Sequence, residues 1–141
     1  MKKFLNYLSF ITLLLAAGLF ILVGYWYFFP GTPVKFFDTP HKVEKKTVKN
    51  GDFLIYDVKY CKYTDITPTL TKAFVDGIIY YLPDTNSRIT KKGCGTNRIF
   101  VFVPKELPIG VYHIAINWHY QVNPVQSVNI YTETEKFTVI K

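Results

Sequence analysis

The sequence has few of the residue types from which most catalytic and metal sites are built. It contains two cysteines and three histidines among 141 residues. The cysteines form no Cys-x-x-Cys pair, which excludes the usual structural zinc sites. The chain also lacks the Gly-x-Ser-x-Gly turn of serine hydrolases, and 93–95 (Gly-Cys-Gly) lacks the Lys-Ser/Thr of a phosphate-binding loop. We therefore predict that the protein is not an enzyme and uses no metal and no cofactor. An enzyme with a site assembled from several loops remains the alternative.

Two histidines could still suggest a metal site, because His113 and His119 fall on the same side of a predicted strand. Six residues of strand separate them by about 20 Å, so one ion could not bind both. Glu133 and Glu135 likewise share a side without a partner that would assign acid and base roles. We interpret all four as solvated surface residues.

Acidic residues are outnumbered by basic ones, at 10 against 17. The basic residues are spread along the chain and accompany no aromatic stacking motif, so we predict no nucleic-acid binding. A solvated surface accounts for them most simply. The alternative is attraction of the lysines in 42–49 to anionic lipid headgroups.

The longest uncharged stretch runs from Leu8 to Phe29. As a helix it would be roughly 33 Å long, enough to cross the hydrocarbon core of a bilayer. It ends on the aromatic run 25–29, a composition typical of headgroup depth. We predict a transmembrane helix over 8–29, preceded by a short cytoplasmic N-terminus over 1–7, with membrane lipid as its partner.

Two other structures could also contain this apolar stretch, a cleaved signal peptide and a buried core helix. Ala16 and Gly18 would suit a signal-peptide cleavage site, but cleavage there would leave the apolar segment 19–29 on the mature chain. A buried core helix would show a polar face, and this stretch has none. The small residues Ala17 and Gly24 could line a contact between helices, although most membrane spans contain such a pair.

The charges that flank the apolar stretch do not agree on its orientation. Lys2 and Lys3 favour a cytoplasmic N-terminus, whereas five lysines follow the span between residues 35 and 49. Because long domains translocate largely regardless of charge, and because of the cysteines discussed below, we predict the N-terminus inside and the C-terminal domain in the periplasm or outside the cell.

The remainder of the chain reads as one all-β domain. A linker over 30–33 (Pro-Gly-Thr-Pro) precedes a domain over 34–141 that is rich in aromatic and β-branched residues and has no helical periodicity. Apolar and polar residues alternate strictly over 112–121, as expected of a half-buried strand. Asp76-Gly77 separates two apolar runs and predicts a hairpin with a type I′ turn. Seven or eight short strands with regular turn signals indicate an antiparallel sandwich.

A short motif carries a resemblance to immunoglobulin-like and fibronectin-type domains. Pro108-Ile-Gly-Val-Tyr112 lies between two strands, like the corner in which a tyrosine of those domains bonds back to the upstream backbone. The resemblance implies that role for Tyr112. Ile114 stands where an antibody domain has its second cysteine, so the chain resembles the broad sandwich family and not antibody domains.

The whole arrangement is similar to small, membrane-anchored immunoglobulin-like sandwich proteins encoded by tailed phages. The similarity lies in the N-terminal anchor together with the segments Tyr60-Cys61-Lys62, Phe74-Val-Asp-Gly77, Gly93-Cys94 and Val103-Pro-Lys105 through Tyr112. That group has no established activity, so the resemblance implies a context and no mechanism.

In a sandwich of this kind, Cys61 ends the second strand and Cys94 lies just before the fifth. Those strands are antiparallel neighbours, so we predict a disulfide that closes a loop and indicates an oxidising compartment. Two free buried thiols are the alternative.

These observations predict a single-pass membrane protein that displays a binding or assembly module outside the cytoplasm, with a protein partner. The alternative is a structural subunit of a membrane or virion complex. The binding face is predicted on two features, an outward row on the strand 112–121 and the hairpin turn. The residues are His113, Asn117, His119, Gln121, Asp76 and Gly77.

Overall fold

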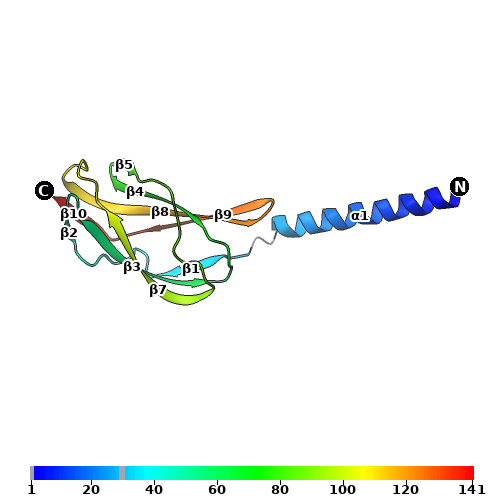
Figure 1. Cartoon of the computed structure of the whole chain (residues 1–141), viewed down its shortest axis with the longest axis horizontal. Helices are drawn as coiled ribbons and strands as arrows, with labels where there is room; N and C mark the ends of the chain where they lie inside the picture. Colours follow the sequence, from blue (N-terminus) through cyan, green and yellow to red (C-terminus); the bar gives the residue numbers. More distant parts are fainter. Residues whose placement is uncertain (1, 29–30) are drawn as a thin grey trace.

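The computed structural model describes residues 2–28 and 31–141, with side chains from residue 6 onward. Met1, Phe29 and Pro30, on which parts of the predicted N-terminus, span and linker fall, lie outside the described residues. A single helix extends from one end of an elongated β domain (Figure 1). The prediction of a mostly β chain with one N-terminal apolar helix is confirmed.

The helix α1 spans Lys2–Phe28 and therefore begins six residues before the predicted start of the span. Its stretch Asn6–Phe28 has a mean hydropathy of 2.3, and none of it is buried against the rest of the chain. A helix that is apolar all round and uncovered by protein is suited to lipid. It is consistent with either a signal anchor or a signal peptide.

The β domain consists of two sheets in a sandwich-like arrangement. The smaller sheet has three strands, in the order β1 (Val34–Phe37), β3 (Phe53–Lys62) and β7 (Gly93–Phe102). The larger sheet has seven strands. Its main path is β2 (Thr47–Lys49), β10 (Phe137–Ile140), β8 (Gly110–Asn123), β4 (Thr69–Asp76) and β5 (Ile78–Tyr81), with β6 (Thr85–Asn86) beside β4 and β9 (Gln126–Glu133) beside β8.

The strand count and the pairing differ in part from the prediction of seven or eight antiparallel strands. The described residues form ten strands, and one of the additional ones, the two-residue β6, carries no apolar alternation that the sequence could reveal. β2 runs parallel to β10, so the larger sheet is mixed. The remaining ladders are antiparallel.

The strand β8 supplies the centre of the core. Its residues Tyr112, Ile114, Ile116, Trp118 and Tyr120 are all 2% exposed or less, while the alternate residues face outward. The predicted alternation is therefore confirmed. Inward side chains of this kind stabilise the sandwich by removing large apolar surfaces from water.

Two hydrogen bonds fix aromatic residues of β8. Trp118 packs against Phe36 of the opposite sheet, with 4.5 Å between ring centroids, and its Nε1 donates to Thr132 Oγ1 at 2.9 Å. The Tyr112 hydroxyl donates to the Pro108 carbonyl at 2.9 Å, which is the backward bond expected at this corner. Buried polar groups of aromatic residues need such partners.

The hairpin between β4 and β5 is present, but the prediction of its turn type was wrong. A two-residue type I′ turn would place Val75 opposite Ile78, whereas the structure pairs Val75 with Ile79. Within this turn only Gly77 has a positive φ, of 67°, whereas a type I′ turn needs two residues with positive φ. The register adds one residue to the loop, and Gly77 is the position that requires glycine.

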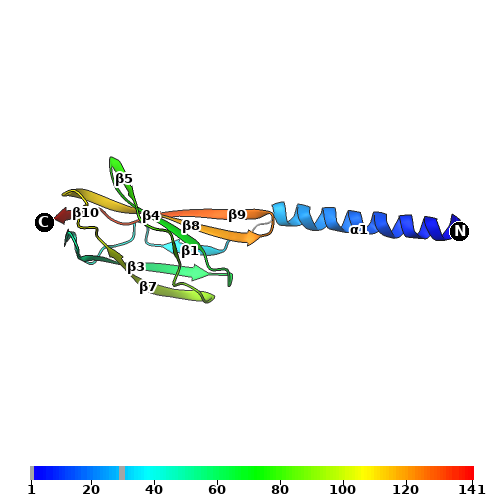
Figure 2. The same ribbon diagram turned by 45° about the horizontal axis from the view of Figure 1, so that its top comes forward.

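The helix meets the domain at the turn between β8 and β9 (Figure 2). Asn123 Nδ2 donates to the Trp26 carbonyl at 3.0 Å, and the Gln126 amide, turned toward the helix, donates to the carbonyls of Trp26 and Tyr27. The last carbonyls of a helix have no partner within it, so these two side chains cap its end. They hold the domain end-on to the helix.

This junction defines a helix-proximal and a helix-distal end of the domain. β2, with Lys49 opposite Ile140 near the C-terminus, lies at the distal end (Figure 1). The lysine-rich segment 42–49 thus runs away from the helix. If α1 spans a bilayer, the distal lysines of this segment lie far from its headgroups, which argues against the lipid-attraction alternative.

Candidate functional site

The predicted face residues do not form one compact site. His113, Asn117, His119 and Gln121 all lie on the outer side of β8, as expected, but the first and last are eight residues apart, about 27 Å along a strand. His113 lies near the distal end, beside the β4–β5 turn that contains Asp76 and Gly77. His119 and Gln121 lie near the helix-proximal end.

Local partners engage several of these side chains. His119 Nδ1 is 2.8 Å from Asn129 Oδ1, and Gln121 Nε2 donates to the Asn123 carbonyl at 2.7 Å. His113 Nε2 lies 3.8 Å from a carboxylate oxygen of Glu133. Over the described residues, no three His, Cys, Asp or Glu side chains come together in a group that could hold a metal ion.

A groove lies between His113 and His119, on the same outer side of the larger sheet. We call it the outer groove; its volume is about 460 Å³. Ala73 and Ala115 are direct partners on β4 and β8 and form its floor. Because alanine is short, a ligand can come close to the sheet there. The walls come from β5, from β9 and from the loop between β1 and β2. The wall residues include Ile79, Tyr81, Tyr131, Glu133, Thr39 and Pro40.

Two strongly exposed tyrosines line the outer groove. Tyr81 is 72% exposed and Tyr131 is 76% exposed, although both lie on strands. Exposed tyrosines that flank a hollow are typical of protein interfaces, because the ring offers a large contact area at low entropic cost. Asn117 adds an unpartnered amide oxygen at the groove.

Sequence reasoning identified Asn117 but missed the residues around it. Tyr131 could have been found, because 128–133 alternates in the same way as β8 and places Tyr131 outside. Tyr81 and Ala73 could not, because their positions depend on the register of β4 with its neighbours. The sequence placed Asn117 on the outer side of β8 but gave no sign of the hollow beside it.

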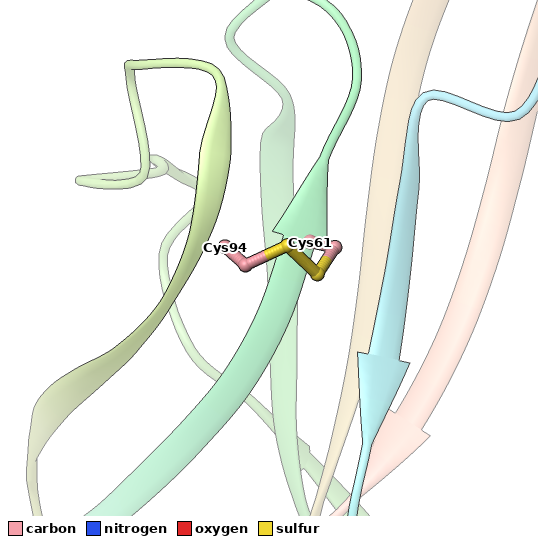
Figure 3. The surroundings of a disulfide bond; sticks show 2 residues. All are labelled: Cys61 and Cys94. Carbon is pink, nitrogen blue, oxygen red and sulfur yellow. A yellow bond between two sulfur atoms is a disulfide. The ribbon is translucent and has the colours of Figure 1, made fainter.

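The predicted disulfide is present and links the two strands of the smaller sheet that were expected. Cys61 of β3 and Cys94 of β7 are direct partners in the ladder, with 3.9 Å between their Cα atoms (Figure 3). β7 begins at Gly93, so Cys94 lies within this strand and not just before it as predicted. No free cysteine remains among the described residues. The bond indicates a domain that matures outside the cytoplasm.

One buried polar residue lies outside the groove and plays a structural role. His41 is 1% exposed, stacks on Tyr56, and neither ring nitrogen has a hydrogen-bond partner. Its backbone N–H donates to the Glu133 carbonyl at 2.7 Å, which brings the segment before β2 beside β9. Burial lowers the pKa of His41, while Asp38 opposes this effect in part.

Acidification should therefore destabilise the domain through His41. Its pKa lies near 6.5 in the unfolded chain and lower in the folded chain, so below about pH 6.5 the unfolded state binds more protons. The free energy of unfolding is expected to fall by up to about 1.4 kcal/mol per pH unit for this one proton. Urea titrations at pH 7.5 and 5.5 measure the change.

The matched variants separate His41 from the other histidines. H41F should flatten the dependence below pH 6.5, whereas the exposed H119Q should leave it unchanged. Equal pH slopes in the parent protein and in H41F would contradict the assignment.

Comparisons with known proteins assign no family to this chain. No family model matches the sequence, and no curated protein matches it. Among solved structures, it is similar to the Pseudomonas fluorescens alkylpurine DNA glycosylase AlkC bound to DNA containing an abasic site analog. The TM-score is 0.41, with 10% identity over 77% of this chain and 31% of that one. At this level the similarity does not bear on function.

Proposed function

We propose that the protein is a single-pass membrane protein that presents a non-enzymatic, immunoglobulin-like binding module outside the cytoplasm. The observation that carries the proposal is the outer groove, with an alanine floor and two exposed tyrosines on an uncovered sheet. A protein partner is the ligand that such a surface favours. The class is the one the sequence resembles, the small membrane-anchored sandwich proteins of tailed phages.

The order of the strands supports the immunoglobulin-like assignment. In such domains strands A, B and E form one sheet, and strands G, F and C form the other. β1, β3 and β7 occupy the first set of positions, and β10, β8 and β4 the second. β5 then follows as strand C′. The bond from Tyr112 to Pro108 supports the same assignment.

The junction with the helix supports the membrane role. Capping by Asn123 and Gln126 holds the long axis of the domain along the helix (Figure 1). With α1 across a bilayer, the outer groove then faces sideways and the C-terminus points away from the lipid. Tethering of this kind raises the effective concentration of the module for partners at the membrane.

Site-specific photocrosslinking tests the binding surface. A photoreactive residue at position 117, placed in the full-length protein in its native cells, should give a discrete protein adduct. Y81A should reduce the adduct yield roughly five- to thirtyfold, the loss of about 1–2 kcal/mol expected for a tyrosine at an interface centre.

The matched control is Y63A, because Tyr63 is 56% exposed but lies in the loop after β3, away from the groove. It should leave the adduct unchanged. A photoreactive residue at Phe102, on the outer side of the smaller sheet, should give no such adduct. Adducts of equal yield from positions 102 and 117 would contradict the proposed surface.

A further inference from the structure

A second hollow opens on the side of the sandwich, between the free edge of β7 and the strands β4 and β6. We call it the side cavity; its volume is about 360 Å³. It shares Lys72 with the outer groove, but its other lining residues are different. Three cationic and three neutral polar residues are among those that line it. They are Lys72, Arg88, Arg98, Asn86, Asn97 and Thr85. Of the described residues, no Asp or Glu lines this cavity.

Two of the three cations in the side cavity, Lys72 and Arg88, are not paired with an anion among the described residues. Lys72 is half-buried on β4, and Arg88 follows β6 in the chain. Over the described part of the chain neither side chain has a hydrogen bond or ion pair, whereas Arg98 pairs with Glu44. Burial lowers the pKa of Lys72, and repulsion from Arg88 lowers it further. A cation in this setting gains stability when an anion binds.

We propose that the side cavity is a binding site for a phosphate group. The fixed fork of an arginine and the compact charge of a lysine are the usual partners of phosphate oxygens, and amide and hydroxyl groups complete such sites. The cavity supplies each of these types, from three separate segments. This inference does not depend on the outer groove or its partner.

Two sources of phosphate are chemically equivalent here, a lipid headgroup and a phosphate free of the bilayer. The β7 residues that line the cavity lie three to six residues beyond Cys94, about 10–20 Å from the helix-proximal end. This position favours a phosphate that is not part of the supporting bilayer.

Thermal unfolding of the full-length protein in neutral detergent tests the site. At matched ionic strength, replacing chloride by inorganic phosphate at about five times its dissociation constant should raise Tm by roughly 4–8 °C. K72M should raise Tm in chloride, because the buried charge and its repulsion are removed, and it should abolish the phosphate increment. R88Q, at an exposed position, should abolish the increment without loss of folding.

The control is K91M, which removes an exposed lysine of the same loop and should keep the full increment. Equal Tm in phosphate and chloride, or an increment that K72M and R88Q retain, would overturn the proposal. Vesicles of phosphatidylcholine with and without phosphatidylglycerol distinguish the sources. If inorganic phosphate raises Tm in both kinds of vesicle, the ligand is a free phosphate. If phosphatidylglycerol removes this rise in Tm, the ligand is the lipid headgroup.

Discussion

Replacing Trp118 with alanine is expected to lower the free energy of unfolding by about 3–5 kcal/mol. Trp118 is fully buried between the sheets, in contact with Phe36, and it is the largest side chain of the core. The substitution leaves a cavity that the two sheets cannot close. It also removes the donor to Thr132 Oγ1, which then remains buried without its partner.

Urea unfolding followed by circular dichroism measures this loss. W118F keeps most of the volume and should cost less than W118A, since only the indole donor and part of the ring are lost. Y131A is the exposed aromatic control and should change the free energy of unfolding by less than about 0.5 kcal/mol. A loss of under about 1 kcal/mol for W118A would contradict the central position of Trp118 in the core.

Removal of the Cys61–Cys94 bond is the second large effect. The two cysteines are 33 positions apart, and on the loop-entropy model a cross-link of that span stabilises by about 3–4 kcal/mol. The double variant C61S/C94S should lose that amount relative to the oxidised protein. Reducing agent should lower the unfolding midpoint of the parent protein and leave that of the variant unchanged.

An intact-mass measurement without reducing agent gives the independent check on this bond. The oxidised chain should be about 2 Da lighter than the reduced one, because two thiol hydrogens are lost. Protein isolated from cells with an unchanged mass, or with thiols that alkylate freely, would contradict the bond and with it the oxidising compartment.

The sequence predicted most reliably the elements that follow a single pattern, either an unbroken apolar run or a period-two alternation. The uncharged run of α1 and the alternation of β8 need no tertiary information, because each follows from a single element and its solvent. The disulfide needed one further step, the neighbourhood of two strands that the sandwich resemblance implied. The backward bond of Tyr112 came from the same resemblance.

The remainder depends on register and on long-range packing. Ala73 meets Ala115 only because of the pairing of β4 with β8, so the floor of the outer groove has no signature in the sequence. Lys72, adjacent in sequence to Ala73, lines both the outer groove and the side cavity, which the sequence does not indicate either. The predicted β4–β5 turn differs from the structure by one residue for the same reason, because local turn preference does not fix the register of β4 with β5.

Burial of His41 illustrates a different limit. It lies in a polar segment with Lys42 and Pro40 beside it, where local composition predicts exposure. Its burial results from the backbone bonds between its segment and Glu133 and Glu135, which are distant in sequence. The burial of His41 therefore depends on how the whole sandwich assembles, and the composition of its own segment does not reveal it.

The measurement that tests the account most directly is the location of the C-terminus. A reporter enzyme that is active only outside the cytoplasm, fused after Lys141 of the full-length chain, should be active and should fractionate with membranes that require detergent for extraction. A cytoplasmic reporter at the same position should be inactive. Activity of the cytoplasmic reporter, or release of the fusion into the aqueous fraction without detergent, would contradict an anchored module outside the cytoplasm.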